Sequence, residues 1–199
     1  GKSSVTVNMA AAMAADGVRV GLLDADIYGH SGPRMLGVEG SHPTIVERMI
    51  MPVPAHGVKL ISTEMFKPDR DAPIAWRGPM LHRALQQFLS DVFWGDLDVL
   101  LLDLPPGTGD VAISLAQFLP SAEIIVVTTP QQVSLADSRR AIRMYEKLNI
   151  PALGVVENMS YYECPQCHHT SNIFGHGGGE TMAEQMGVPF LGRLPIYEP

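Results

Sequence analysis

The sequence predicts an α/β fold built on a mostly parallel sheet with helices on both faces. Two observations support this prediction. Strand-like runs alternate with helical runs along the whole chain, as in folds made of β-α-β units. The strand-like runs are continuous blocks of Val, Ile and Leu, which is the pattern of strands buried on both faces.

The individual elements follow from local patterns. Residues 2–16 are rich in Ala and Met and are followed by Gly17, so they are expected to form the first helix. The apolar blocks predict six strands, at 18–24, 58–62, 98–104, 123–129, 152–158 and 189–194. Helices fit between them at about 79–94, 111–118, 134–148 and 178–186. Residues 29–57 carry much Gly, Pro and His with little periodicity, which predicts a long irregular excursion.

Composition narrows the class of protein. A chain of 199 residues, 46% hydrophobic, can bury a sizeable core, and we expect one domain over residues 1–199, cut short at both ends. The net charge of -7 and the lack of a Lys or Arg run argue against nucleic-acid binding. The apolar runs are too short to span a bilayer and no signal pattern precedes them, so a cytoplasmic protein without a membrane partner is expected.

The first four residues, GKSS, have the ending of a Walker A phosphate-binding loop and stand directly before the first predicted helix. In such loops the backbone amides around Gly1 and the helix amino terminus cradle phosphate. Lys2 would reach the terminal phosphates, and a hydroxyl of Ser3 or Ser4 would bind magnesium. Four residues alone are equally compatible with an ordinary helix start capped by serine.

Three aspartates stand at the ends of predicted strands. Asp24 and Asp26 lie in GLLDADIYG, and Asp103 lies in LLLDLPPGTGD. Ligands of open parallel sheets bind at the carboxyl ends of strands, so these residues are expected to share one site. Asp103 would hold the magnesium shell through water, the amide of Gly107 would meet the terminal phosphate, and Asp26 would orient or activate the attacking water. The alternative makes the aspartates helix caps or turn formers.

These motifs resemble those of the deviant-Walker-A ATPases of the SIMIBI class of P-loop NTPases, and within that class the Mrp/Nbp35/ApbC family of iron–sulfur carriers. The resemblance runs over essentially all 199 residues, through GKSSVTVNMA, LLDADIYGHS, DLPPGTGD, TTPQ, ENMS and CPQC. In that family the loop reads KGGVGKS, and its extra lysine would precede Gly1. No Asn-Lys-x-Asp guanine signature occurs, which favours ATP over GTP.

The resemblance implies a function and roles for the matching residues. It implies that Lys2, Ser3 and Ser4 bind phosphate and magnesium, with Ser3 as the magnesium ligand. Lys2 and Asp26 would serve hydrolysis, and Asn158 would read the adenine edge. The chain would then be a slow ATPase that carries an iron–sulfur cluster and delivers it to apoproteins.

Cys164 and Cys167 are the only cysteines, and they form a CxxC pair in an expected loop at 159–177. Soft thiolates suit zinc or iron–sulfur, but either normally takes four ligands. Two copies facing each other about a two-fold axis would complete a four-thiolate site, which predicts a homodimer. The resemblance implies a labile, bridging 4Fe-4S cluster there.

Other interpretations of the pair stay open. Zinc could fill the same four-thiolate site. A thioredoxin-type redox pair needs a helix directly after it, whereas CPQCHHTSN is expected to continue as polar loop. His168, His169 and His176 could complete a mononuclear site within one chain.

Two other functions fit part of the sequence. A ParA- or MinD-like spatial-positioning ATPase would share every phosphate-binding residue but has no use for CPQC. An electron donor resembling nitrogenase reductase would present its cluster cysteines on separate segments. The cluster carrier is therefore the predicted function.

Overall fold

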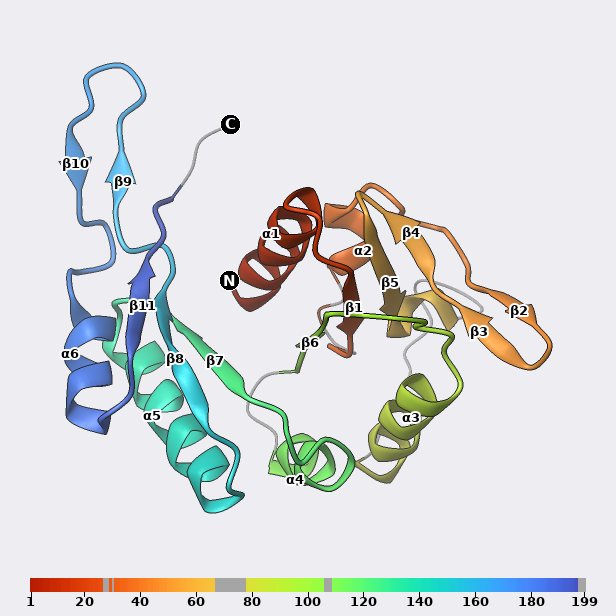
Figure 1. The fold of residues 1–199 in the computed structure, drawn as a ribbon. Helices are drawn as coiled ribbons and strands as arrows, with labels where there is room; N and C mark the ends of the chain where they lie inside the picture. The colour runs from red at the N-terminus through yellow and green to blue at the C-terminus, as the bar shows by residue number, and fades with distance from the viewer. Residues whose placement is uncertain (27–28, 30, 67–77, 106–108, 197–199) are drawn as a thin grey trace. The chain divides into compact units, whose positions relative to one another are not determined.

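A computed structural model describes residues 1–26, 29, 31–66, 78–105 and 109–196 (Figure 1). The chain divides into two compact units. We call Ser3–Ser114 the N-terminal unit, and Leu115–Pro199 together with Gly1–Lys2 the C-terminal unit. The single domain expected over residues 1–199 stays a prediction. In the described ranges, no helix combines the length and the apolar character needed to cross a membrane.

The N-terminal unit contains a four-stranded sheet in the order β4-β5-β1-β6. Strands β1 (Val20–Asp24), β5 (Val58–Ser62) and β6 (Val99–Asp103) run parallel. Strand β4 (Val53–Ala55) is antiparallel to β5 and lies at the edge, where the proline at position 54 removes no ladder bond from a central strand. The predicted strands of this unit are confirmed to within one or two residues.

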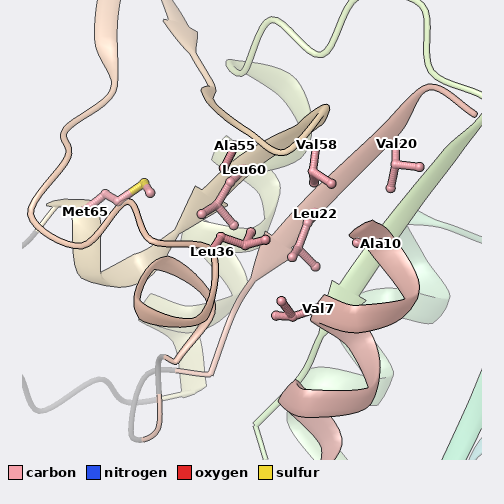
Figure 2. Close-up of a cluster of buried hydrophobic side chains, with 9 residues drawn as sticks. All are labelled: Val7, Ala10, Val20, Leu22, Leu36, Ala55, Val58, Leu60 and Met65. Atoms are coloured by element: carbon pink, nitrogen blue, oxygen red, sulfur yellow. The ribbon is translucent and has the colours of Figure 1, made fainter. Parts of the chain in front are cut away.

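Helix α1 (Lys2–Ala15) covers one face of this sheet through apolar side chains spaced one turn apart (Figure 2). Its Val7 and Ala10 join a buried cluster with residues of the strands and of the following segment: Val20, Leu22, Leu36, Ala55, Val58, Leu60 and Met65. On the other face, a Cβ at Gly21 would lie 2.6 Å from Cδ1 of Leu97. Apolar side chains thus pack on both faces, as the continuous apolar strands predict.

The prediction of an irregular excursion over 29–57 is wrong for much of that segment. It contains α2 (Gly32–Met35), β4, and an antiparallel hairpin of β2 (Thr44–Val46) and β3 (Met49–Met51). The hairpin turns at Glu47 and Arg48, whose φ angles are 49° and 71°. Tight turns of this kind usually carry Asn or Gly, and strands of three residues show no clear alternation, so no sequence signal marked this hairpin.

The C-terminal unit contains a parallel sheet in the order β11-β8-β7. Its strands are β7 (Ile124–Thr128), β8 (Ala152–Glu157) and β11 (Phe190–Arg193). Helices α5 (Gln132–Lys147) and α6 (Gly178–Met186) pack on it. The core consists of Val126, Leu135, Ile142, Val155, Met182 and Ala183. Each of these elements was predicted, with ends that differ by a few residues.

The remaining elements are η1 (Thr63–Phe66), α3 (Gly78–Ser90), α4 (Gly109–Phe118), β9 (Tyr162–Glu163) and β10 (Thr170–Ser171). Helix α3 ends four residues before the predicted end at 94. The reason is a competing backbone pairing, because Ile50 donates to the carbonyl of Asp91 and accepts from the amide of Phe93. The α/β class with mostly parallel strands is confirmed.

Candidate functional site

The carboxyl ends of β1 and β6 bring two buried aspartates together in the N-terminal unit. Asp24 and Asp103 are direct register partners on these neighbouring parallel strands. Only 1% of Asp24 and 3% of Asp103 is exposed to solvent. The sequence predicted this meeting of carboxylates at one sheet edge, and the structure places them there.

Asp24 is held by three hydrogen bonds from the segment that follows it and from β5. Its Oδ2 accepts from the amide of Gly32 at 3.0 Å and from Oγ of Ser62 at 3.2 Å, and its Oδ1 accepts from the amide of Asp26 at 3.3 Å. A Cβ at Gly32 would lie 2.8 Å from Oδ2, so only glycine allows this approach. Sequence reasoning did not identify Gly32 or Ser62, because their role depends on strand pairing and loop closure.

The protonation of Asp24 is finely balanced. Burial raises the pKa of Asp24 to about 7, the amide of Gly32 opposes this rise, and the charge of Asp103 adds to it. Two buried carboxyls side by side are unfavourable when both are ionised. A cation at this edge would relieve that repulsion, which is the environment expected for a magnesium site.

Asp26 follows β1 and is 8% exposed. Its Oδ1 accepts a hydrogen bond from the amide of Gly29 at 3.1 Å. Asp24 and Asp26 therefore make the cap and turn contacts that the alternative interpretation expects. Such contacts do not require the burial of Asp24 beside Asp103, and the role of these aspartates in ligand binding stays a prediction. Gly107 lies outside the described residues.

The first turn of α1 contains Lys2, Ser3 and Ser4, and Gly1 precedes it. The first amides of any helix lack partners within the helix, so this end suits an anion. Nδ2 of Asn158 donates to the carbonyl of Gly1 at 3.2 Å, and its Oδ1 accepts from the amide of Met159 at 3.0 Å. The residue predicted to read adenine therefore contacts the first residue of the predicted phosphate loop.

The two cysteines lie in the turn of a short antiparallel hairpin. Residues 159–177, which we call the cysteine arm, contain β9 and β10, with Thr170 opposite Glu163. The amide of Cys164 donates to the carbonyl of His169 at 3.0 Å, and the amide of His168 donates to the carbonyl of Cys164 at 2.9 Å. Neither cysteine forms a disulfide, and Cys167 is exposed.

The hairpin corrects the expectation that CPQCHHTSN continues as polar loop. Its strands have two residues each and are mostly polar, so no alternation marked them. A hydrogen bond of 2.9 Å between Nδ1 of His168 and Oε1 of Glu163 supports the turn. The next helix, α6, begins only at Gly178, so the pair does not stand at the amino terminus of a helix as a thioredoxin-type pair does.

Cys164 and Cys167 have no set of further ligands around them in the described part of the chain. There, no group of three or more His, Cys, Asp or Glu side chains could hold a metal ion. His168, His169 and His176 all belong to the described residues. The structure therefore does not assemble the mononuclear site that was one alternative.

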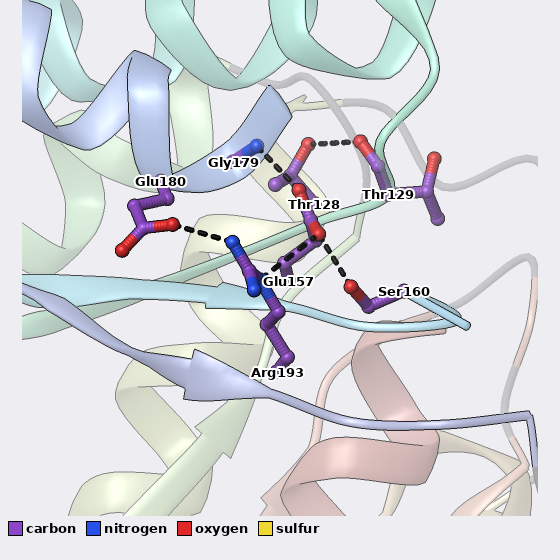
Figure 3. Close-up of polar contacts among 7 residues, drawn as sticks. All are labelled: Thr128, Thr129, Glu157, Ser160, Gly179, Glu180 and Arg193. Carbon is purple, nitrogen blue, oxygen red and sulfur yellow. Dashed lines mark hydrogen bonds and ion pairs between the residues drawn. The ribbon is translucent and has the colours of Figure 1, made fainter. Parts of the chain in front are cut away.

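A buried polar network at the base of the cysteine arm was not identified from the sequence (Figure 3). Glu157, the last residue of β8, is fully buried. It accepts from Oγ of Ser160 at 2.5 Å and from the amide of Gly179, and Oε1 lies 3.8 Å from Nε of Arg193. Arg193 also pairs with Glu180. The sequence feature that could have identified Glu157 is its position at the end of the otherwise apolar run ALGVVE.

Parallel strands that end in buried aspartates, with a GKSS segment opening a helix, define a P-loop NTPase. A ParA family model, described as the NUBPL iron-transfer P-loop NTPase, matches residues 1–199. The chain belongs to this family. The resemblance drawn from the motifs is thereby confirmed.

Curated relatives agree with this assignment. An iron-sulfur cluster carrier protein of Mycobacterium tuberculosis is 55% identical over 202 residues, which cover 98% of this chain and 52% of that protein. One of Methanocaldococcus jannaschii is 50% identical over 198 residues, covering 98% of this chain and 68% of that protein. The chain thus spans about half the length of its mycobacterial relatives.

Solved structures agree on the fold. A nucleotide-binding protein of Archaeoglobus fulgidus, solved in complex with ADP, is 34% identical with a TM-score of 0.84, and the match covers 98% of this chain and 76% of that one. The cell division ATPase MinD of Pyrococcus furiosus has a TM-score of 0.64 at 21% identity, over 98% of this chain and 78% of that one. The likeness to MinD shows the fold alone.

Proposed function

We propose that this chain is an ATP-dependent carrier of iron–sulfur clusters, which it delivers to apoproteins. The observation that carries this proposal is the placement of two cysteines that form no disulfide, Cys164 and Cys167, in the turn of a hairpin arm. Thiolates are the ligands that iron–sulfur clusters take in proteins. Membership of an iron-transfer family and similarity to named cluster carriers support the same conclusion.

One chain offers only half of the ligand set. A 4Fe-4S cluster takes four thiolates, and within the described residues no third His, Cys, Asp or Glu completes a site. A homodimer in which the arms of two copies face each other would supply Cys164 and Cys167 twice. The cluster would then be a bridging cargo, and zinc is the competing occupant of the same four thiolates.

The nucleotide is proposed to be ATP. By their motif matches, Gly1, Lys2, Ser3 and Ser4 would bind its phosphates. Asn158 would read the adenine edge. Magnesium would be held by Ser3 and, through water, by Asp103, and it would neutralise charge on the terminal phosphates.

Hydrolysis is proposed to be slow and coupled to carriage of the cluster. Asp24 and Asp103 would sense the terminal phosphate at the ends of β1 and β6, Gly107 would donate its amide there, and Asp26 would orient the attacking water. Nothing in the charge pattern favours DNA or a membrane as partner, so we assign the function to the cytoplasm.

The stoichiometry of the anaerobically reconstituted protein tests the proposal. Iron, sulfide and zinc are measured together with the mass of the species in solution. The expected result is one 4Fe-4S cluster for each dimer, with the broad visible absorbance of thiolate-bound iron–sulfur, and its transfer to an apoprotein. A monomer that retains its full iron content would contradict the shared site, and a dimer that holds only zinc would favour the zinc alternative.

A further inference from the structure

We propose that Glu157 is a positioning residue that anchors both ends of the cysteine arm and so fixes where the thiols are presented to a second copy. The inference rests on the proposed function for the role of the thiols. The anchor itself rests on contacts within the C-terminal unit, where one buried carboxylate contacts Ser160 near the start of the arm and Gly179 just beyond its end (Figure 3).

The first end of the arm is held through a side chain. Ser160 lies three residues after Glu157 and is fully buried. Its Oγ donates to Oε1 of Glu157 at 2.5 Å. Because Cys164 follows only four residues later, a fixed Ser160 limits the directions that β9 can take.

The second end is held through the backbone. The amide of Gly179, in the first turn of α6, donates to Oε2 of Glu157. A Cβ at position 179 would lie 2.9 Å from Oε2 and 3.0 Å from Cβ of Glu157, so the contact depends on glycine. The two residues joined by this carboxylate are 19 positions apart in sequence, and the arm is the segment between them.

Other contacts hold only the first end. The amide of Ser160 donates to the carbonyl of Leu194 at 2.9 Å, and the amide of Ile196 donates to the carbonyl of Tyr161 at 2.6 Å. These bonds tie the start of the arm to the segment after β11. The carboxylate of Glu157, by contrast, contacts both Ser160 near the start of the arm and Gly179 just beyond its end.

Burying a carboxylate such as that of Glu157 carries a desolvation cost. A charge taken out of water is unfavourable unless donors and a counter-ion compensate it, and apolar residues of similar volume often stabilise a fold as well. Here Ser160, Gly179 and the nearby Arg193 supply that compensation. Buried hydrogen-bonded networks of this kind favour one conformation, which is what a shared thiolate site requires of its arms.

Glu157 also stands beside the residue assigned to adenine. Asn158 follows it directly and contacts the carbonyl of Gly1 at 3.2 Å. A shift of the backbone at Asn158 would therefore move the anchor of the arm. One peptide bond thus connects Asn158, the residue predicted to read adenine, to Glu157, the residue that anchors the arm.

Hydrogen exchange on the metal-free protein tests the anchor. Glu157→Gln is expected to speed amide exchange about tenfold at both ends of the arm, over 159–163 and 175–179, since bonds to a charged group are lost. Ser160→Ala should do so at 159–163 only. Glu180→Gln, which removes the other partner of Arg193, is the matched control and should change neither. Slow exchange in β7 and β8 shows that a variant is folded. If Glu157→Gln does not fold, the exchange of Ser160→Ala at 159–163 decides whether the anchor exists.

Cluster retention then tests the positioning role. After anaerobic reconstitution, loss of the cluster to a chelator should be about tenfold faster in Glu157→Gln and Ser160→Ala, and unchanged in Glu180→Gln. If amide exchange at the arm ends is faster but the rate of cluster loss is unchanged, Glu157 has no positioning role. If a folded Glu157→Gln shows unchanged amide exchange at the arm ends, Glu157 is not the anchor. If the wild type binds no cluster, the proposed function is wrong. The hydrogen-exchange result then still shows whether Glu157 anchors the arm.

Discussion

The acidic edge of the N-terminal unit and the cysteine arm of the C-terminal unit hold their reactive groups in opposite ways. Asp24 and Asp103 are almost fully buried at the ends of two paired parallel strands. Cys164 and Cys167 lie in the turn of a hairpin whose strands have two residues each, and Cys167 is exposed. The carboxylates are in place within one chain, whereas the thiols would supply half of the ligand set that we propose.

This difference matches the two kinds of chemistry that we propose. Phosphate transfer to water depends on groups that are fixed before the nucleotide arrives, because electrostatic stabilisation works best when little rearrangement is needed. A carrier must both hold a cluster and release it, which favours ligands near the surface. The following predictions test whether the two regions are as separable as this comparison implies.

The largest effect is expected from replacing both cysteines with serine. Cys164→Ser with Cys167→Ser should abolish iron binding, because the arm then offers no thiolate. ATP affinity, measured by titration with a fluorescent analogue, should stay within about twofold of the wild type, because the backbone hydrogen bonds of Cys164 are to His168 and His169 of the same turn. Loss of both activities together would show that the regions are not separate.

Lys2→Ala tests the other region. Removal of the lysine that would reach the terminal phosphates should lower the rate of ATP hydrolysis by about 100-fold, the effect of removing one charge-stabilising group. Cluster assembly in vitro should be retained. Lys147→Ala, at the exposed end of α5, makes the same change in charge and serves as the control. Equal turnover in both variants would contradict the role of Lys2.

The buried Asp24 predicts a dependence of stability on pH. Its pKa is raised from 3.8 to about 7, so the folded state binds this proton more tightly than the unfolded chain does. Its contribution to the free energy of unfolding should therefore fall as pH rises from about 4 to about 7, by about 1.4 kcal/mol for each pKa unit.

Urea unfolding of the protein without nucleotide or magnesium, at pH 5 and pH 8, measures this contribution. The difference between the two pH values should be smaller in Asp24→Asn than in the wild type, because the variant has no carboxyl to ionise at this position. Identical pH profiles would show that Asp24 does not titrate as its surroundings imply.

The smallest effect is expected from Gly179→Ala. The added methyl would lie 2.9 Å from Oε2 of Glu157, so α6 or the carboxylate must shift. Overpacking of this kind costs about 1–3 kcal/mol, which a urea midpoint would detect. The variant should leave ATP affinity unchanged. A urea midpoint equal to that of the wild type would show that the base of the arm accommodates the added methyl group without loss of stability.

The sequence predicted the elements that have strong local signals. The apolar blocks around Leu22, Leu101 and Val155 marked parallel strands correctly, and the position of Asp24 and Asp103 at strand ends followed from them. The β2–β3 hairpin was missed because Glu47 and Arg48 adopt positive φ without the residue types that usually do so.

The missed parts of the candidate site depend on residues far apart in sequence. Ser62 reaches Asp24 only through the pairing of β5 with β1. Glu157 meets Gly179 and Arg193 only after two further elements have packed. The roles assigned to the phosphate-binding residues, and the pairing of two arms, stay predictions that the experiments above decide.

The shortness of the β9–β10 ladder has a consequence for release. With only two residue pairs, Thr170 with Glu163 and Ser171 with Tyr162, the tip can open locally at a small fraction of the free energy needed to unfold the sheet behind it. In the carrier that we propose, brief opening of the turn that holds Cys164 and Cys167 would release the cluster, and the short ladder would then re-form.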